Sequence, residues 1–180
     1  FKKLFVPFNN AKEASLIDGI KVYCVKNLLE LCNFFEDEKS MEANKEIYVF
    51  ADNDIDTNCS LDMADIQGQF QAKRALQIAA AGSHNILLSG PPGSGKTLLA
   101  KTLPSILPPL TIDEALEVTK IYSVAGLLPH DKPLQKTRPF RTVHHTASGT
   151  SIVGGGRIPR PGEISLAHRG VLFFDELAEF

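Results

Sequence analysis

The stretch that decides the fold is NILLSGPPGSGKT, residues 85–97. Its apolar start predicts a short strand over 86–88, and its end predicts a helix that opens at Lys96. The glycine-rich turn from Gly90 to Thr97 fits the pattern G-x-x-x-x-G-K-[ST] of a phosphate-binding loop. Glycines are needed in such a loop because several backbone N–H groups must turn toward the same phosphate oxygens.

The residues of this loop have distinct expected roles. The positive N-terminal end of the following helix faces the same anion as the backbone N–H groups. Lys96 can reach the β- and γ-phosphates, and the hydroxyl of Thr97 can bind Mg²⁺. We therefore expect nucleotide contacts from Gly90, Pro91, Pro92, Gly93, Ser94, Gly95, Lys96, Thr97 and Leu98.

A second stretch, VLFFDE at 171–176, supplies the acids that such a site needs. Its continuous apolar run predicts a strand covered on both faces, as in a parallel sheet. Asp175 would hold Mg²⁺, and Glu176 would polarise the attacking water. By itself the run could be any core strand that ends at solvent. Downstream of a phosphate-binding loop, it favours hydrolysis of ATP or GTP.

Composition sets broad limits. With 180 residues, 43% of them hydrophobic and 22% charged, the chain has globular values and room for one domain or parts of two. It has no apolar run of membrane-spanning length and no signal peptide, so we expect a cytoplasmic location. Because it begins at Phe1 without methionine and stops soon after Glu176, we expect a fragment. The formal charge of −2 hides an arginine-rich segment, 138–169, in which Glu163 is the only acid.

Hydrophobic periodicity and capping residues predict the elements along the chain. Strands are expected at Lys3–Pro7, 20–25, 139–144 and Val171–Phe174. Helices are expected at 10–17, 28–35, 69–81, 96–103, 111–122 and 163–168, with a long glycine-rich loop before the last of these. In the helix over 69–81 the inner face would consist of Phe70, Ala72, Ala75, Leu76 and Ala79.

Three of these stretches together resemble an AAA+ ATPase: DIQGQ at 65–69, GPPGSGKT at 90–97 and GVLFFDE at 170–176. Two more, RPFRTVHHTAS at 138–148 and GGGRIPRPGEISLAH at 154–168, are similar to the magnesium-chelatase-like YifB/ComM family of bacteria. Residues 1–35 resemble the end of the Lon-protease-like domain (ribosomal S5 domain 2-like) that precedes the ATPase in that family.

The resemblance implies an α/β fold. Residues 61–180 would be the first part of an AAA+ P-loop core, a parallel sheet with helices on both faces, cut after the Walker B strand. Residues 1–35 would be the C-terminal remnant of the Lon-protease-like domain, and 36–60 an acidic linker. The family's strand order, 5-1-4-3-2, would leave strand one without its two neighbours. We therefore expect the isolated 180-residue chain to fold poorly and to hydrolyse ATP negligibly.

The resemblance also implies the parts of the site. ATP and Mg²⁺ would be the cofactors, with Mg²⁺ held by Thr97 and Asp175. Glu176 would be the catalytic base and Lys96 a second catalytic group. Ile66 and Gln67 would lie beside the adenine. The sensor residues and arginine finger of the family would follow residue 180, and the motor would work as a ring-shaped homo-oligomer, a hexamer.

The substrate of the motor is less sharply predicted. Arginines on a glycine-rich loop can grip phosphates without reading bases, so Arg157 and Arg160, supported by Arg138 and Arg141, favour a DNA motor of the ComM branch-migration type. Alternatively, these arginines pair with acids of the fold or of the next subunit. Other candidate functions are a magnesium chelatase motor subunit, a Lon-like unfoldase and protease, and a non-catalytic nucleotide switch. The pair His144-His145 suggests a strand end beside the site rather than a zinc ligand set.

Overall fold

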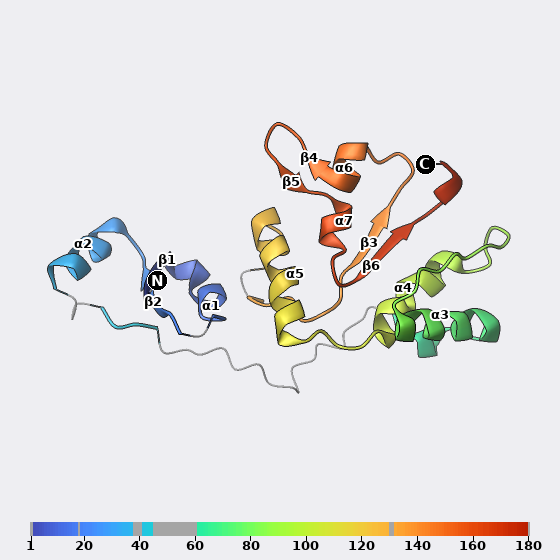
Figure 1. Ribbon diagram of the computed structural model, residues 1–180, viewed down its shortest axis with the longest axis horizontal. Helices are drawn as coiled ribbons and strands as arrows, with labels where there is room; N and C mark the ends of the chain where they lie inside the picture. The colour runs from blue at the N-terminus through green and yellow to red at the C-terminus, as the bar shows by residue number, and fades with distance from the viewer. Residues whose placement is uncertain (1, 18, 38–40, 45–60, 130–131, 180) are drawn as a thin grey trace. The chain divides into compact units, whose positions relative to one another are not determined.

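The computed structural model describes residues 2–17, 19–37, 41–44, 61–129 and 132–179 (Figure 1). The chain divides into two compact units, which are described separately. The first unit comprises Phe1–Asp52 with Leu128–Leu134, and the second comprises Asn53–Leu127 with Gln135–Phe180. Most of the expected linker at 36–60 lies outside the described residues.

The first unit is built on two parallel strands, β1 (Lys3–Pro7) and β2 (Lys21–Val25). Helix α2 (Leu28–Glu36) follows, and the Asn27 side chain caps it by accepting a hydrogen bond from the Glu30 N–H at 2.9 Å. Phe34 of α2 is fully buried, and its ring centroid lies 4.8 Å from that of Tyr23. An aromatic cluster therefore holds α2 against this small sheet.

The predicted helix over 10–17 is much shorter in the structure. A 3-10 turn (η1, Phe8–Asn10) leads into α1 (Ala11–Ala14), and the chain then turns at Ser15. Neither predicted capping asparagine caps it. The Asn10 amide donates to the Glu13 carboxylate at 3.3 Å instead of accepting from a backbone N–H.

The core of the second unit joins α3 (Phe70–Gly82), α4 (Lys96–Ile106) and a 3-10 turn, η4 (Met63–Asp65). Its buried members are Met63, Ile66, Leu76 and Leu99, and the apolar residues packed against them are Ala72, Ile86, Leu88, Leu103 and Ile106. Packing by Leu103 and Ile106 explains why α4 continues through Pro104, although the sequence predicted an end before this proline. Proline has no N–H to donate to the Ala100 carbonyl, so α4 continues past Pro104 without that hydrogen bond.

The predicted inner face of α3 is wrong at two of its five residues, Phe70 and Ala75. Phe70 is 83% exposed, and Ala75 is exposed as well, whereas Leu76, Ala79 and Ala80 are buried. At about 100° per residue, Phe70 lies roughly 120° around the helix from Leu76, which places it outside the buried stripe. The helix also includes Gly82 and ends at Ser83, which adopts φ +52°.

The strand predicted over 86–88 is absent among the hydrogen-bonded strands of the described residues. The segment still has the alternating burial of a strand, because Ile86 and Leu88 pack on the core while Leu87 is 77% exposed. A strand is defined by its ladder to a neighbour, and none of the described strands pairs with this segment.

Helix α5 (Ile112–Ala125) begins with the predicted capping box. The Thr111 hydroxyl accepts from the Glu114 N–H at 3.3 Å, and the Glu114 carboxylate accepts from the Thr111 N–H at 3.0 Å. The helix runs further than the predicted end near residue 122 and stops at Gly126, whose φ of +70° favours glycine.

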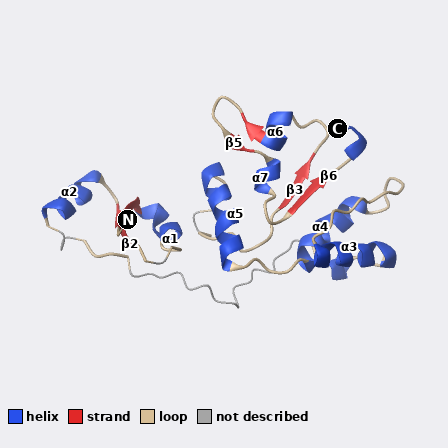
Figure 2. Cartoon of the chain, in the orientation of Figure 1, coloured by secondary structure: helices blue, strands red, loops and turns tan. Residues whose placement is uncertain are grey.

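Strands β3 (Phe140–Val143) and β6 (Val171–Phe174) pair in parallel, with Phe140 opposite Val171 and Val143 opposite Phe174 (Figure 2). Their pairing confirms the strands predicted at these positions. All residues of β6 are half-buried rather than covered on both faces, because β3 is its only strand neighbour among the described residues.

The segment predicted as a glycine-rich loop is partly regular. It contains α6 (Gly149–Val153) and a hairpin of β4 (Gly154–Gly155) with β5 (Arg160–Pro161). The helix predicted at 163–168 follows as α7 (Glu163–Leu166). Ser148 caps α6 by accepting from the Ser151 N–H at 3.2 Å. The hairpin tip extends away from both helices (Figure 1). No helix in the described part of the chain is long and apolar enough to cross a membrane.

Candidate nucleotide-binding site

The glycine-rich loop has the backbone that a phosphate cradle needs. Gly93 and Gly95 adopt φ of +76° and +85°, which side-chain-bearing residues rarely adopt. A Cβ at Gly90 would lie 3.1 Å from Ser94 Oγ, so a side chain there would crowd the loop. Gly95 leads directly into α4, whose first residue is Lys96. The loop therefore fits an anion held at the start of a helix.

Lys96 lies against the loop rather than pointing into solvent. Its ammonium donates to the carbonyl of Gly90 at 2.9 Å and to that of Pro91 at 3.0 Å. Charge-assisted hydrogen bonds are stronger when the acceptor is ionised. A phosphate in the loop would thus offer this ammonium a better acceptor than either neutral carbonyl.

The segment before α3 is tied to the loop. The Gln69 side-chain amide donates to the Ser94 carbonyl at 3.3 Å, and the Lys73 ammonium donates to the Ile66 carbonyl. The Ile66 side chain is 9% exposed and belongs to the core, whereas its neighbour Gln67 is exposed. The predicted contact of Ile66 and Gln67 with adenine stays a prediction.

The predicted acids follow β6, and α4 contacts that strand. The Asp175 N–H donates to the Val143 carbonyl at 3.4 Å, which extends the β3–β6 ladder by one bond. Thr97 and Leu98 lie in the first turn of α4, half-buried and exposed respectively. A hydroxyl and a carboxylate are hard oxygen donors of the kind that bind Mg²⁺ together with phosphates, so Thr97 and Asp175 fit that ion. Their metal contacts remain predictions.

Glu176 has a partner that sequence reasoning missed. Its Oε2 lies 3.0 Å from Nδ1 of His145, with side chains 64% and 41% exposed. Sequence reasoning placed the histidine pair at a strand end beside the site but gave it no partner. The contact could have been found from the positions of the two residues relative to the strand ends. His145 and Glu176 each come two residues after the paired strand ends Val143 and Phe174.

Two of the arginines offered for DNA contacts are engaged within the fold. Arg138 donates to the carbonyls of Pro108 and Arg169, each at 2.6 Å. Arg141 binds Glu163 with both ends of its guanidinium, and this hydrogen bonding raises the pKa of Arg141. Both arginines therefore have partners inside the fold, including the acids Glu114, 3.5 Å from Arg138, and Glu163.

Arg157 and Arg160 differ. Both are exposed on the β4–β5 hairpin, and within the described residues neither side chain has a hydrogen-bonding or ionic partner. Ile158 between them is 74% exposed. These cations are therefore available to a ligand.

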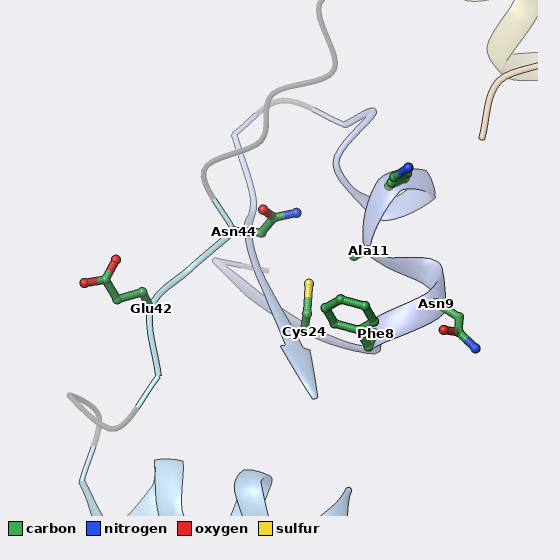
Figure 3. A pocket seen from close by; sticks show the side chains of 7 residues that line it. Phe8, Asn9, Ala11, Cys24, Glu42 and Asn44 are labelled. Atoms are coloured by element: carbon green, nitrogen blue, oxygen red, sulfur yellow. The ribbon is translucent and has the colours of Figure 1, made fainter. Parts of the chain in front are cut away.

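A pocket of about 620 Å³ lies within the first unit, away from these residues in the sequence (Figure 3). Its lining consists of Phe8, Asn9, Ala11, Lys12, Cys24, Glu42 and Asn44. None of the predicted site residues belongs to it.

Comparison with known proteins adds family information. Residues 62–180 match the family model described as magnesium chelatase, subunit ChlI. The chain is 45% identical over 181 residues to the competence protein ComM of Haemophilus influenzae, which covers 99% of this chain and 35% of that protein. It is 45% identical over 179 residues to the uncharacterized protein YifB of Escherichia coli, covering 99% and 34%.

A more distant relative is the magnesium-chelatase 67 kDa subunit of Heliobacterium mobile. It is 30% identical over 146 residues, covering 66% of this chain and 22% of that protein. The chain spans about a third of the length of the ComM and YifB proteins that it matches.

Proposed function

The chain belongs to the YifB/ComM family of magnesium-chelatase-like proteins, and from this premise we propose that in the native-length protein it binds ATP with Mg²⁺ and hydrolyses it. The strongest support is the loop Gly90–Thr97, whose left-handed glycines and helix start form a cradle for phosphate. Lys96 already holds its ammonium over that loop.

The proposed roles follow from the chemistry of each group. The loop N–H groups bind the phosphates and fix their orientation, and Lys96 neutralises charge on the β- and γ-phosphates. Thr97 and Asp175 hold Mg²⁺, which supplies further positive charge when bound. Glu176 accepts a proton from the attacking water. Adjacent acids at the end of β6 favour hydrolysis over a nucleotide switch, because a switch needs no proton acceptor.

The test is Mg²⁺-dependent release of phosphate from ATP by the native-length protein, with nucleotide binding measured separately by a fluorescent ATP analogue. Lys96→Ala should abolish binding and hydrolysis, since nothing else in the loop supplies a cation. Lys101→Ala is a matched control on the exposed side of the same helix. Wild-type protein that neither binds ATP nor releases phosphate would refute the proposal, as would full binding by Lys96→Ala.

We further propose that the motor acts on DNA as a ring of subunits, a hexamer, in the manner of a branch-migration helicase. Support comes from Arg157 and Arg160, which lie on an exposed hairpin and have no partner in the described part of the chain, and from the relative named competence protein ComM. Arginine side chains without an internal partner can bind backbone phosphates and displace the counterions around them.

Salt-dependent DNA binding tests this second step. Arg157→Ala with Arg160→Ala should weaken binding and reduce the slope of log affinity against log salt by about 2. The control carries Arg74→Ala with Lys101→Ala, which removes the same charge from exposed positions on α3 and α4. Equal losses in both double variants would argue against a hairpin contact.

The alternative of a magnesium chelatase motor subunit is less well supported. The 67 kDa chelatase subunit matches 66% of the chain at 30% identity, whereas ComM matches 99% at 45%. Insertion of Mg²⁺ into a porphyrin would need partner subunits, and a Lon-like protease would need a catalytic Ser–Lys dyad.

A further inference from the structure

We propose that Gln69 is a positioning residue for the phosphate-binding loop, and that its side-chain amide fixes the direction of the peptide between Ser94 and Gly95. This role rests on the ATP site proposed above. The pattern of the loop does not include Gln69, and the adenine contacts expected from this segment are those of Ile66 and Gln67. The assignment comes from one hydrogen bond and from the backbone on both sides of it.

The hydrogen bond joins two segments that lie 25 residues apart in the sequence. Nε2 of Gln69 donates to the Ser94 carbonyl at 3.3 Å. Because a trans peptide is planar, its C=O and N–H point in opposite directions. Holding the Ser94 carbonyl toward Gln69 therefore turns the Gly95 N–H away from α3. Among the described residues no acceptor is found for that N–H, so it is available to an anion at the start of α4.

The loop needs such a support because its backbone is otherwise free to rotate. Gly93 and Gly95, on either side of Ser94, have no Cβ to restrict them, and both adopt left-handed φ angles. On one side, the Ser94 N–H donates to the Pro91 carbonyl at 3.3 Å. On the other side, the Ser94 carbonyl accepts from Gln69. Both peptides of Ser94 are therefore oriented by hydrogen bonds.

Gln69 is itself held in place by the fold. Its backbone adopts φ +53° and ψ +36°, a left-handed conformation that persists in non-glycine residues where the surroundings hold it. Its carbonyl accepts from the Lys73 N–H at 2.9 Å, and the Lys73 ammonium donates to the Ile66 carbonyl. Ile66 packs in the same buried core as Leu99 of α4. Since α4 continues directly from the loop, this packing fixes Gln69 relative to the loop.

Two substitutions separate the amide from the backbone that carries it. Gln69→Gly removes the side chain and relieves the left-handed strain, because glycine adopts this backbone freely. Gln69→Met keeps the length of the side chain and the strain, but it has no N–H to donate. Each variant of the native-length protein should bind a fluorescent ATP analogue roughly three- to tenfold more weakly, as expected for the loss of one hydrogen bond.

Kinetics and stability exclude a merely structural role. KM for ATP should rise by a similar factor in both variants while kcat changes less than about twofold, because the loop holds the phosphates before and during the reaction. Gln69→Gly should unfold at the wild-type temperature or above it. Gln71→Met is the matched control, since Gln71 is exposed on the same helix and has no side-chain partner in the described part of the chain. It should bind the analogue within about twofold of wild type.

Tripolyphosphate, which has the phosphates of ATP but no base, separates an effect on the loop from an effect on adenine. Its affinity, measured by displacement of the fluorescent analogue, should fall by the same factor as that of ATP in both Gln69 variants. Unchanged binding of tripolyphosphate would overturn the proposal, because Gln69 would then act on the base. Wild-type affinity in Gln69→Gly or Gln69→Met would overturn it too, as would an equal loss in Gln71→Met.

Failure of the proposed function would look different. In that case the wild-type protein itself would bind no ATP, and the role of Gln69 would be overturned with the site that it serves. If wild-type protein binds and hydrolyses ATP but the Gln69 variants do not behave as stated, the ATPase proposal stands and only the role of Gln69 is wrong.

Discussion

Arg141 of β3 binds both carboxylate oxygens of Glu163 at the start of α7, at 2.5 Å and 2.7 Å. The side chains are 30% and 24% exposed, so solvent screens the pair only in part. A bidentate pair also fixes direction as well as distance. Strand β3 and the helix that follows the β4–β5 hairpin, α7, are therefore joined at one point.

Breaking this pair should destabilise the second unit. Glu163→Gln leaves the Arg141 guanidinium without its ionised partner, and we expect the free energy of unfolding to fall by about 1–2 kcal/mol. Urea denaturation measures the change. Glu117→Gln is the comparison, because Glu117 and its partners Arg169 and His168 are more exposed, at 44%, 42% and 45%, and their contacts should matter less. Equal losses of unfolding free energy in the two variants would show that partial burial does not strengthen the pair of Arg141 and Glu163.

Glu176→Gln should separate ATP binding from hydrolysis. The amide keeps the size of the side chain but cannot accept the proton from water, so the variant should bind the fluorescent ATP analogue and release almost no phosphate. We expect it to accumulate as an ATP-bound oligomer, visible by size-exclusion chromatography. Glu179→Gln, in the turn that follows, should leave turnover unchanged. Normal turnover by Glu176→Gln would show that another group is the base.

Gly162 should tolerate no side chain. A Cβ there would lie 2.6 Å from the Val153 carbonyl carbon and would also overlap the Gly154 nitrogen and the Ile152 oxygen. Gly162→Ala should therefore cost about 1–3 kcal/mol of stability or displace the hairpin. Gly149→Ala is the control, since a Cβ at Gly149 meets nothing within 4 Å. Thermal unfolding of both variants measures the two effects. A milder effect at Gly162 than at Gly149 would contradict the close approach of Gly162 to the backbone of residues 152–154.

Tyr122 should make stability depend on alkaline pH. Its hydroxyl donates to the Leu166 carbonyl at 3.1 Å, and burial raises the pKa of Tyr122 above its ordinary value. Because the folded-state pKa is raised, the stabilisation is complete below the unfolded pKa of about 10 and is lost as pH rises through the folded value.

Tyr122→Phe tests this dependence. At neutral pH the variant should lose about 1 kcal/mol with the hydrogen bond to Leu166. Above about pH 10 the difference in free energy of unfolding between wild type and variant should shrink. Tyr122 then ionises in the unfolded wild type but stays neutral in the folded state, and the variant has no phenol at this position. Urea midpoints at the two pH values measure it. A constant difference would mean that the pKa of Tyr122 is the same in the folded and unfolded states.

Features that depend on nearby residues were predictable from the sequence. Strands β1 and β6 have the predicted bounds, and Asn27 and Thr111 cap their helices as expected. Caps and short apolar strands are determined within a few residues, so pattern and residue type suffice. The phosphate-binding loop belongs to the same class, although its contacts with a nucleotide stay predictions.

Features that depend on distant partners were not predictable. The segment 86–88 has the alternation of a strand but no neighbour among the described strands, and Phe70 lies outside the buried stripe that other elements define. The β4–β5 hairpin has strands too short for a periodic signal. The contact of His145 with Glu176 depends on the register of β3 against β6, which the pattern of either strand does not fix.

The closed base of the β4–β5 hairpin has a consequence for engineering. Because the backbones of Gly154 and Gly162 meet so closely, the two ends of the hairpin are fixed to each other whatever the sequence of the tip at 156–159. Its sequence can be exchanged as a cassette while the supporting helices keep their places. Related proteins can in this way present different hairpin tips on the same supporting helices.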